Sequence, residues 1–141
     1  MAAAATKPTT RRKSTPISTH SIVSMFAGCG GLDLGFLGNF SLHGEKYPKL
    51  AFSILKAYDH DATCIKTYTD NIGSHGEVAD LADFDVATMP KADVLIAGFP
   101  CQDFSICGPR AGLTSKRGRL YQALTRYMTV HHGEGRRNAG V

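Results

Sequence analysis

The hydrophobic pattern predicts short strands that alternate with helices. Residues 22–26 form a β-branched, apolar run, which is typical of a strand. The glycine-rich residues 28–31 end this run, and residues 32–37 have the pattern of a helix start. By the same reasoning we predict strands at 50–58, 77–78 and 92–99, helical segments at 62–69, 82–88 and 120–128, and a loop at 38–49.

This alternation predicts an α/β fold with a mostly parallel sheet, because parallel strands need crossover connections and helices supply them. Residues 92–99 are almost continuously apolar, which is typical of a strand covered on both faces. In the predicted helix at 120–128, Tyr121, Leu124 and Met128 fall on one face. No fifth strand pattern follows, so we expect the sheet to contain only the first four strands.

Composition excludes several classes of protein. With 141 residues, 43% of them hydrophobic and 20% charged, the chain is an ordinary single-domain globular protein. Its apolar runs are far shorter than the roughly 18 residues that a membrane span needs, and its start lacks the order of a secretory signal. The four cysteines have no zinc or disulfide spacing. We therefore expect no membrane, no metal and a cytoplasmic location.

The net charge of +4 is unevenly distributed. Residues 1–20 carry four basic side chains and no acid, and residues 110–141 carry seven basic side chains and one acid. Between them, residues 21–109 carry five basic and eleven acidic side chains. Basic ends suit a polyanion such as nucleic acid, although solvated termini explain them equally. Residues 1–19 are predicted to be a disordered leader.

Three predicted strands end in residues that suit a ligand, as expected for the carboxyl edge of a parallel sheet. The turn at 28–31 lets the backbone approach a ligand, or is only a tight turn; it is not the dinucleotide fingerprint, because Asp33 takes the third glycine position. Asp59 is spaced to bind ribose hydroxyls or to cap a helix, and Asp80 is a ligand or a solvated carboxylate. Together the acids favour a cationic ligand, such as a sulfonium cofactor.

Cys101 directly follows the clearest strand, at the place where α/β enzymes present a nucleophile. A buried, inert thiol is the alternative. Arg110, Arg117 or a helix N-terminus would favour ionisation of the thiol. Cys29, Cys64 and Cys107 are interpreted as bystanders.

Two segments together carry a specific resemblance. Residues 26–36 read Phe-Ala-Gly-Cys-Gly-Gly-Leu-Asp-Leu-Gly-Phe, and residues 98–105 read Gly-Phe-Pro-Cys-Gln-Asp-Phe-Ser. They closely resemble the first and fourth signature motifs of the DNA cytosine 5-methyltransferases. Residues 117–121 look like the segment that follows the catalytic loop of that family, so the resemblance covers roughly residues 20–127.

The resemblance implies a Rossmann-like, S-adenosylmethionine-dependent methyltransferase fold that acts on DNA. It implies that Cys101 is the nucleophile that attacks carbon 6 of cytosine. It assigns the cofactor to one set of residues, namely Phe26, Ala27, Gly28, Cys29, Gly30, Gly31, Asp59, His60, Asp80, Leu81, Pro100 and Leu120. In this set Asp59 binds the ribose and Asp80 the adenine amino group. DNA contacts fall to Gln102, Ser105 and Arg117, in a loop that closes over the DNA.

Some parts of the family pattern are missing. The chain has no Glu-Asn-Val segment, no Arg-x-Arg strand and no target recognition domain. We therefore expect an amino-terminal part of the catalytic domain at residues 20–128, with an unstructured or aberrant tail at 129–141, from a bacterial or phage-like enzyme. The alternatives are an inactive or complementing cofactor-binding half that needs a second chain, and a non-catalytic module that contacts nucleic acid. A thiol hydrolase lacks a recognisable histidine partner.

Overall fold

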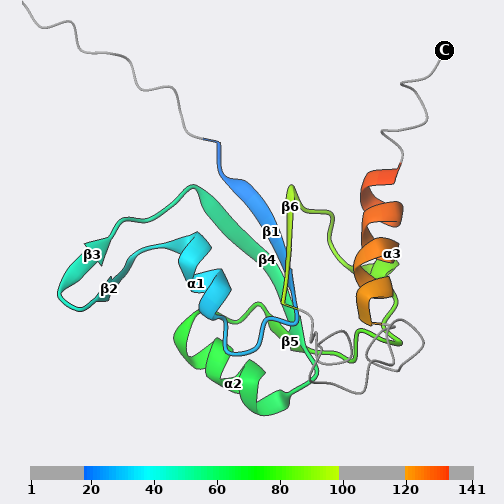
Figure 1. Ribbon diagram of the computed structural model, residues 1–141, viewed down its shortest axis with the longest axis horizontal. Coiled ribbons are helices and arrows are strands. Elements are labelled where there is room, and N and C mark those ends of the chain that lie inside the picture. The colour runs from blue at the N-terminus through cyan, green and yellow to red at the C-terminus, as the bar shows by residue number, and fades with distance from the viewer. Residues whose placement is uncertain (1–17, 99–119, 134–141) are drawn as a thin grey trace, which may run out of the picture.

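The computed structural model describes residues 18–98 and 120–133, and these residues form the expected α/β arrangement (Figure 1). The strands are β1 (His20–Met25), β2 (Phe40–Leu42), β3 (Glu45–Tyr47), β4 (Phe52–Asp59), β5 (Gly76–Val78) and β6 (Val94–Ala97). The helices are α1 (Gly31–Leu37), α2 (Ala62–Asn71), the 3₁₀ turn η1 (Val86–Thr88) and α3 (Leu120–His132). The α/β fold class predicted from the hydrophobic pattern is confirmed.

The main sheet has the strand order β5-β4-β1-β6. Every pair in it is parallel: β1 pairs with both β4 and β6, and β4 pairs with β5. The register places Met25 of β1 between Tyr58 of β4 and Ala97 of β6. The carboxyl ends of the strands therefore meet at one edge, where a parallel sheet holds its ligands.

Helices cover the two faces of the sheet, with α1 and α2 on one side and α3 on the other (Figure 1). The alternation of side chains along β1 serves both faces, because successive residues of a strand point in opposite directions. Val23 and Met25 join the apolar core that contains Ala123 and Tyr127 of α3. Ser24 points to the other face, where it donates a hydrogen bond to Asp33 of α1. This double coverage explains why residues 22–25 of β1 are all buried.

The prediction of a loop at 38–49 is wrong. Strands β2 and β3 form an antiparallel hairpin there, and the rings of Phe40 and Tyr47 stack across it at 4.7 Å. Both residues of its two-residue turn, His43 and Gly44, have positive φ, as the hairpin turn that follows the twist of strands requires. The usual Asn-Gly signal for this turn is missing, so the local pattern did not reveal it.

The face of the last helix that carries Tyr121 and Met128 is not the buried one. Tyr121 and Met128 are exposed by 44% and 48%, whereas Ala123 and Tyr127 are fully buried. Leu124 lies partly buried against the same core. The Tyr127 hydroxyl explains this choice, because it donates to the Pro90 carbonyl at 2.9 Å and accepts from the Ala92 amide at 3.1 Å. A buried hydroxyl needs such partners, so it decides the rotation of α3.

The last helix is longer than expected. It continues to His132, so residues 129–132 are helical although they belong to the segment predicted as an unstructured tail. His131 explains part of this extension, because its Nε2 lies 3.0 Å from the carbonyl oxygen of Val86. Residues 134–141 and the predicted leader up to residue 17 lie outside the described residues. Among the helices of the described ranges, none is long and apolar enough to span a membrane.

Candidate functional site

The predicted ligand residues of three strands come together at the carboxyl edge of the sheet. The Ala27 amide donates to the Tyr58 carbonyl at 3.0 Å, and the Ala79 amide donates to the Asp59 carbonyl at 2.8 Å. The Gly98 amide donates to the Met25 carbonyl at 3.2 Å. These bonds extend the strand pairing past the end of each strand. They align the glycine turn with the backbone segments that lead to Asp80 on one side and toward Cys101 on the other.

Asp59 organises this edge. Its Oδ2 accepts a 2.8 Å hydrogen bond from the Gly28 amide, and its Oδ1 accepts a 3.0 Å bond from the Asp61 amide. The helix-cap alternative for Asp59 is wrong, because Asp61 caps α2 and accepts from the amides of Thr63 and Cys64. These two amide bonds hold the pKa of Asp61 below its usual value. Asp59 is thus left to tie the glycine turn to β4.

Gly28 and Gly30 of this turn both require glycine, but for different structural reasons. Both adopt positive φ, +55° at Gly28 and +86° at Gly30, which favours glycine. A Cβ at Gly30 would stand 2.1 Å from Ile72 Cδ1 and 2.6 Å from Tyr68 Cδ2, so Gly30 allows the turn to pack on α2. A Cβ at Gly28 would meet no described atom within 4 Å. The described part of the chain therefore leaves space beside Gly28, next to the amide that Asp59 holds.

A buried carboxylate that the sequence reasoning did not single out supports the turn from behind. Asp33 is 0% exposed and accepts hydrogen bonds from Ser24 Oγ at 2.9 Å and from the Tyr68 hydroxyl at 3.0 Å. It thereby joins β1, α1 and α2. Burial, followed by the charge and the hydrogen bond of Asp33, raises the pKa of Tyr68. Only its place within the glycine motif marked Asp33, and that pattern does not reveal its partners.

Phe26 leads into the glycine turn, and His60 lies next to Asp59. Phe26 has a positive φ of 56°, which is rare for a bulky residue, and its ring lies partly buried against the core. The His60 side chain is 79% exposed, and its Nδ1 lies 3.3 Å from Asp59 Oδ1. The strained Phe26 backbone redirects the chain from β1 into the glycine turn.

Asp80 and Leu81 are neighbours in the sequence, but their side chains lie in different surroundings. Asp80 is exposed, and its Oδ1 accepts from the Ala82 amide at 3.1 Å. Leu81 is only 2% exposed and belongs to the core with Tyr127. The carboxylate therefore remains accessible at the edge, whereas the Leu81 side chain lies in the core.

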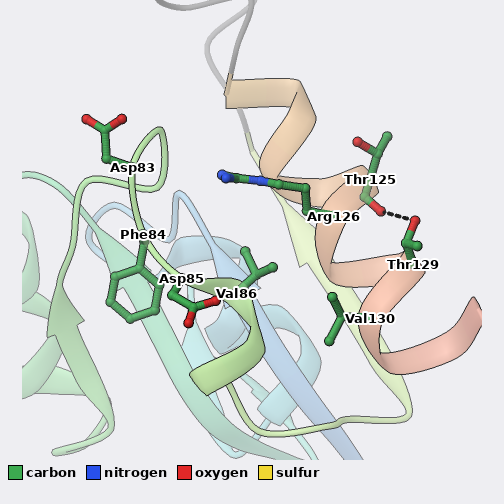
Figure 2. Close-up of a pocket in the computed structure, with 8 residues that line it drawn as sticks. All are labelled: Asp83, Phe84, Asp85, Val86, Thr125, Arg126, Thr129 and Val130. Carbon is green, nitrogen blue, oxygen red and sulfur yellow. Dashed lines mark hydrogen bonds between the residues drawn. The ribbon is translucent and has the colours of Figure 1, made fainter.

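Arg126 of α3 holds the loop behind Asp80. Its Nη2 donates to the carbonyl oxygens of Leu81 and Ala82 at 3.2 and 3.3 Å. Figure 2 shows it reaching from α3 across a groove of about 560 Å³, which is lined by Asp83, Phe84, Asp85, Val86, Thr125, Arg126, Thr129 and Val130. None of these eight residues belongs to the predicted cofactor set. Sequence reasoning counted Arg126 only as a charge, since no local pattern links it to residue 81.

The remaining predicted residues divide into two groups. Leu120 begins α3 and is partly buried. The predicted nucleophile Cys101, the cofactor residue Pro100 and the DNA residues Gln102, Ser105 and Arg117 lie outside the described residues. Their assignments stay predictions.

Comparisons with known proteins agree with this geometry. Residues 20–131 match the family of C-5 cytosine-specific DNA methylases. The Type II methyltransferase M.NgoFVII of Neisseria gonorrhoeae is 34% identical over 112 residues, which cover 77% of this chain and 27% of that protein. The DNA (cytosine-5-)-methyltransferase M.ApeKI of Aeropyrum pernix is 36% identical over 132 residues, covering 78% and 26%. The chain thus spans about a quarter of the length of these relatives.

A solved structure shows the same fold. The S. pombe Dnmt2 methyltransferase superimposes with a TM-score of 0.56 at 15% sequence identity, over 80% of this chain and 33% of that one. The glycine turn, the acids at the ends of β4 and β5 and the parallel sheet are thus accompanied by a family match over most of the sequence. The chain belongs to the C-5 cytosine-specific DNA methylase family.

Proposed function

We propose that this chain binds S-adenosylmethionine at the carboxyl edge of its sheet, as part of an enzyme that methylates carbon 5 of cytosine in DNA. The main support for this proposal is the contact between Asp59 and the glycine turn. The Asp59 carboxylate holds the Gly28 amide at 2.8 Å, beside a space in which a Cβ at Gly28 would meet no described atom within 4 Å. A turn that lacks a side chain next to an oriented carboxylate suits a ligand that contacts the backbone.

The residues around this space fit the cofactor. A carboxylate offers about four lone pairs, so Asp59 can accept from ribose hydroxyls while it keeps its two backbone donors. Asp80 is free to accept from the adenine amino group, and Phe26 and His60 offer ring faces nearby. The sulfonium of the cofactor is cationic, and the acidic edge favours it by Coulomb attraction.

Residues 27–31 and Leu120 complete the proposed cofactor set, together with Pro100, which lies outside the described residues. When bound, the cofactor supplies an electrophilic methyl group. Because the Leu81 side chain is buried, we propose that Leu81 acts by supporting Asp80.

Cys101 is the proposed nucleophile. Its thiolate sulfur would form a bond to carbon 6 of cytosine, which makes carbon 5 nucleophilic. Carbon 5 would then attack the methyl group of S-adenosylmethionine, and the methyl–sulfur bond would break to leave a neutral thioether. Loss of the carbon 5 proton to a base and cleavage of the sulfur–carbon 6 bond then restore the aromatic ring and the thiolate. The target base must leave the duplex for this attack, and Gln102, Ser105 and Arg117 are the proposed DNA contacts. A cytoplasmic location stays a prediction.

A second candidate shares the proposed cofactor site with the first. In this alternative the chain is a cofactor-binding half that transfers no methyl group until a second chain completes the site. Both candidates require the same cofactor site, and they differ in whether Cys101 reacts with DNA in this chain alone.

The test of the cofactor site is calorimetric titration of the purified chain with S-adenosylmethionine. We expect Asp80→Ala and Gly28→Ala to weaken binding about tenfold to a hundredfold, because each removes or blocks a contact worth roughly 1.5 to 3 kcal/mol. Asp59→Ala should weaken it further, but it also leaves the amides of Gly28 and Asp61 without an acceptor.

Asp70→Ala is the matched control, since this carboxylate is exposed on α2 and, among the described residues, pairs with Lys66. Thermal denaturation of every variant separates loss of binding from loss of fold. Unchanged affinity in both Asp80→Ala and Gly28→Ala, with wild-type stability, would contradict the proposed site.

The two candidates are separated by covalent trapping on DNA that contains a mechanism-based cytosine analogue. Trapping by the chain alone that disappears in Cys101→Ser supports the active enzyme. Trapping only after the second chain is added supports the complementing half. Trapping that survives in Cys101→Ser contradicts the proposed nucleophile.

A further inference from the structure

Arg126 of α3 binds one side of a peptide group whose other side binds Asp80. The Arg126 Nη2 donates to the Leu81 carbonyl oxygen at 3.2 Å. This carbonyl and the Ala82 N–H belong to the same peptide group, and the N–H donates to Asp80 Oδ1 at 3.1 Å. A peptide group is planar and trans, so its C=O and N–H point in opposite directions. Arg126 and the Asp80 carboxylate therefore hold one rigid plane from its two sides.

A second bond restrains the next peptide group. The same Nη2 of Arg126 also donates to the Ala82 carbonyl oxygen at 3.3 Å. The two peptide groups that flank Ala82 thus share one donor, so neither can rotate without losing a bond. The Asp80 carbonyl oxygen accepts from the amides of Asp83 and Phe84 at 3.2 and 3.0 Å, which closes the turn. In this turn the direction of the Asp80 carboxylate depends on the orientation of the Ala82 amide.

Other contacts of α3 determine where Arg126 points. Its neighbour Tyr127 is fully buried, and the Tyr127 hydroxyl donates to the Pro90 carbonyl oxygen at 2.9 Å. One helical turn later, His131 Nε2 lies 3.0 Å from the Val86 carbonyl oxygen. These contacts fix the rotation of α3, and Figure 2 shows Arg126 reaching from this helix toward the loop. The guanidinium is therefore placed by the helix and not by the loop that it binds.

This arrangement leaves one oxygen of Asp80 for a ligand. The Asp80 side chain is exposed, its Oδ1 accepts from the Ala82 amide, and its Oδ2 has no hydrogen-bond partner among the described residues. An ionised carboxylate only accepts hydrogen bonds, so this oxygen suits a ligand group that donates. The amino group of a purine donates, whereas an oxo group at the same ring position only accepts. A carboxylate of fixed direction can distinguish the two, because it cannot turn away from the wrong group.

We propose that Arg126 is a positioning residue that makes the site select a 6-aminopurine over a 6-oxopurine, because it fixes the peptide group that orients the Asp80 carboxylate. This inference rests on the proposed function, which assigns the adenine amino group to Asp80. Arg126 acts through the Ala82 amide and is not itself a ligand of the cofactor. Without Arg126 the peptide group between Leu81 and Ala82 turns more freely, and the carboxylate no longer penalises the oxo compound.

The experiment titrates the full chain with two ligands that differ only at this ring position. S-adenosylhomocysteine has the adenosyl group of the cofactor, and S-inosylhomocysteine carries an oxo group in place of the amino group. Calorimetry gives the ratio of the two dissociation constants. For the wild-type chain we expect a preference of about tenfold or more for the amino compound. In Arg126→Ala this preference should fall by a factor of about three or more, because Asp80 and Arg126 are coupled through one peptide group.

Further variants separate positioning from a general loss of structure. Both bonds of Arg126 come from a single nitrogen, so the one ammonium group introduced by Arg126→Lys should restore part of the preference. In an Asp80→Ala chain, Arg126→Ala should change the ratio no further, because both residues act through one carboxylate. Lys66→Ala is the matched control, since it removes an exposed cation of α2 that pairs with Asp70. It should keep the wild-type ratio.

Exchange of the Ala82 amide hydrogen with solvent, measured by NMR, tests the peptide group without a ligand. We expect faster exchange in Arg126→Ala and wild-type exchange in Lys66→Ala. An unchanged exchange rate in a folded Arg126→Ala chain would overturn the proposal. So would an unchanged preference in that chain, or a wild-type chain that binds both compounds equally well. If the wild-type chain binds neither compound, the proposed function fails and the selectivity assigned to Arg126 fails with it, whereas the exchange rate still decides whether Arg126 holds the peptide group.

Discussion

Two regions at the carboxyl edge of the sheet are held in different ways. The glycine-turn region, residues 26–33 with Asp59, is held by carboxylates: Asp59 binds the Gly28 amide, and Asp33 binds two hydroxyls in the interior. The loop region, residues 79–92 with α3, is held by an apolar core that includes Leu81 and Tyr127. The polar region thus fixes backbone beside open space, whereas the apolar region supports exposed carboxylates, among them Asp80.

Gly30→Ala is expected to have the largest effect, because it breaks the close packing of the glycine-turn region. The new Cβ would clash with Ile72 and Tyr68 in a backbone of positive φ. A left-handed alanine costs roughly 1–2 kcal/mol and overpacking adds roughly 1–3 kcal/mol, so we expect the free energy of unfolding to fall by about 3 kcal/mol. Urea denaturation followed by circular dichroism measures it.

Gly35→Ala is the control for Gly30→Ala. No described atom lies within 4 Å of a Cβ at Gly35, and alanine favours the helix, so we expect unchanged or increased stability. Equal losses in the two variants would show that Gly30 does not serve this packing.

Tyr127→Phe tests the loop region and is expected to have an intermediate effect. Its ring remains, but the buried Ala92 amide loses its acceptor and the Pro90 carbonyl loses its donor. Unpaired buried groups cost about 1 to 3 kcal/mol, so we expect the unfolding midpoint in urea to decrease by the equivalent of about 2 kcal/mol. Tyr47→Phe keeps the ring that stacks on Phe40 and should leave the midpoint unchanged. A Tyr127→Phe protein as stable as wild type would mean that packing alone positions α3.

Asp80→Ala is expected to have the smallest effect on stability, because Asp80 belongs to the proposed ligand site and not to the core of the loop region. The side chain is exposed and accepts from one amide of its own loop, so stability should stay within about 0.5 kcal/mol, as for most surface substitutions. Its effect on the affinity for S-adenosylmethionine should be much larger. A thermal melt and a titration of the same sample provide both values, and a large loss of stability would place Asp80 among the structural residues.

The sequence predicted those parts of the proposed site whose elements follow one another directly along the chain. Strand β1, the glycine turn and helix α2 follow one another in a pattern that identifies each of them, and Asp59 stands where β4 ends. The hairpin of β2 and β3 was not predicted, because His43 and Gly44 are not the usual residues of such a turn. The buried face of α3 was not predicted either, because the hydrogen-bond partners of Tyr127 lie at residues 90 and 92.

The order of residues along the chain was therefore enough to predict the fold class, the family resemblance and the edge of the sheet at which the proposed site lies. Hydrophobic periodicity and glycine placement are properties of short segments, so they can be recognised without knowing which distant segments are in contact. The bond between Asp33 and Tyr68, and the hold of Arg126 on the loop behind Asp80, depend instead on how the chain folds. These interactions join residues 35 or more positions apart, and sequence spacing carries no signal for contacts that depend on how the helices pack on the sheet.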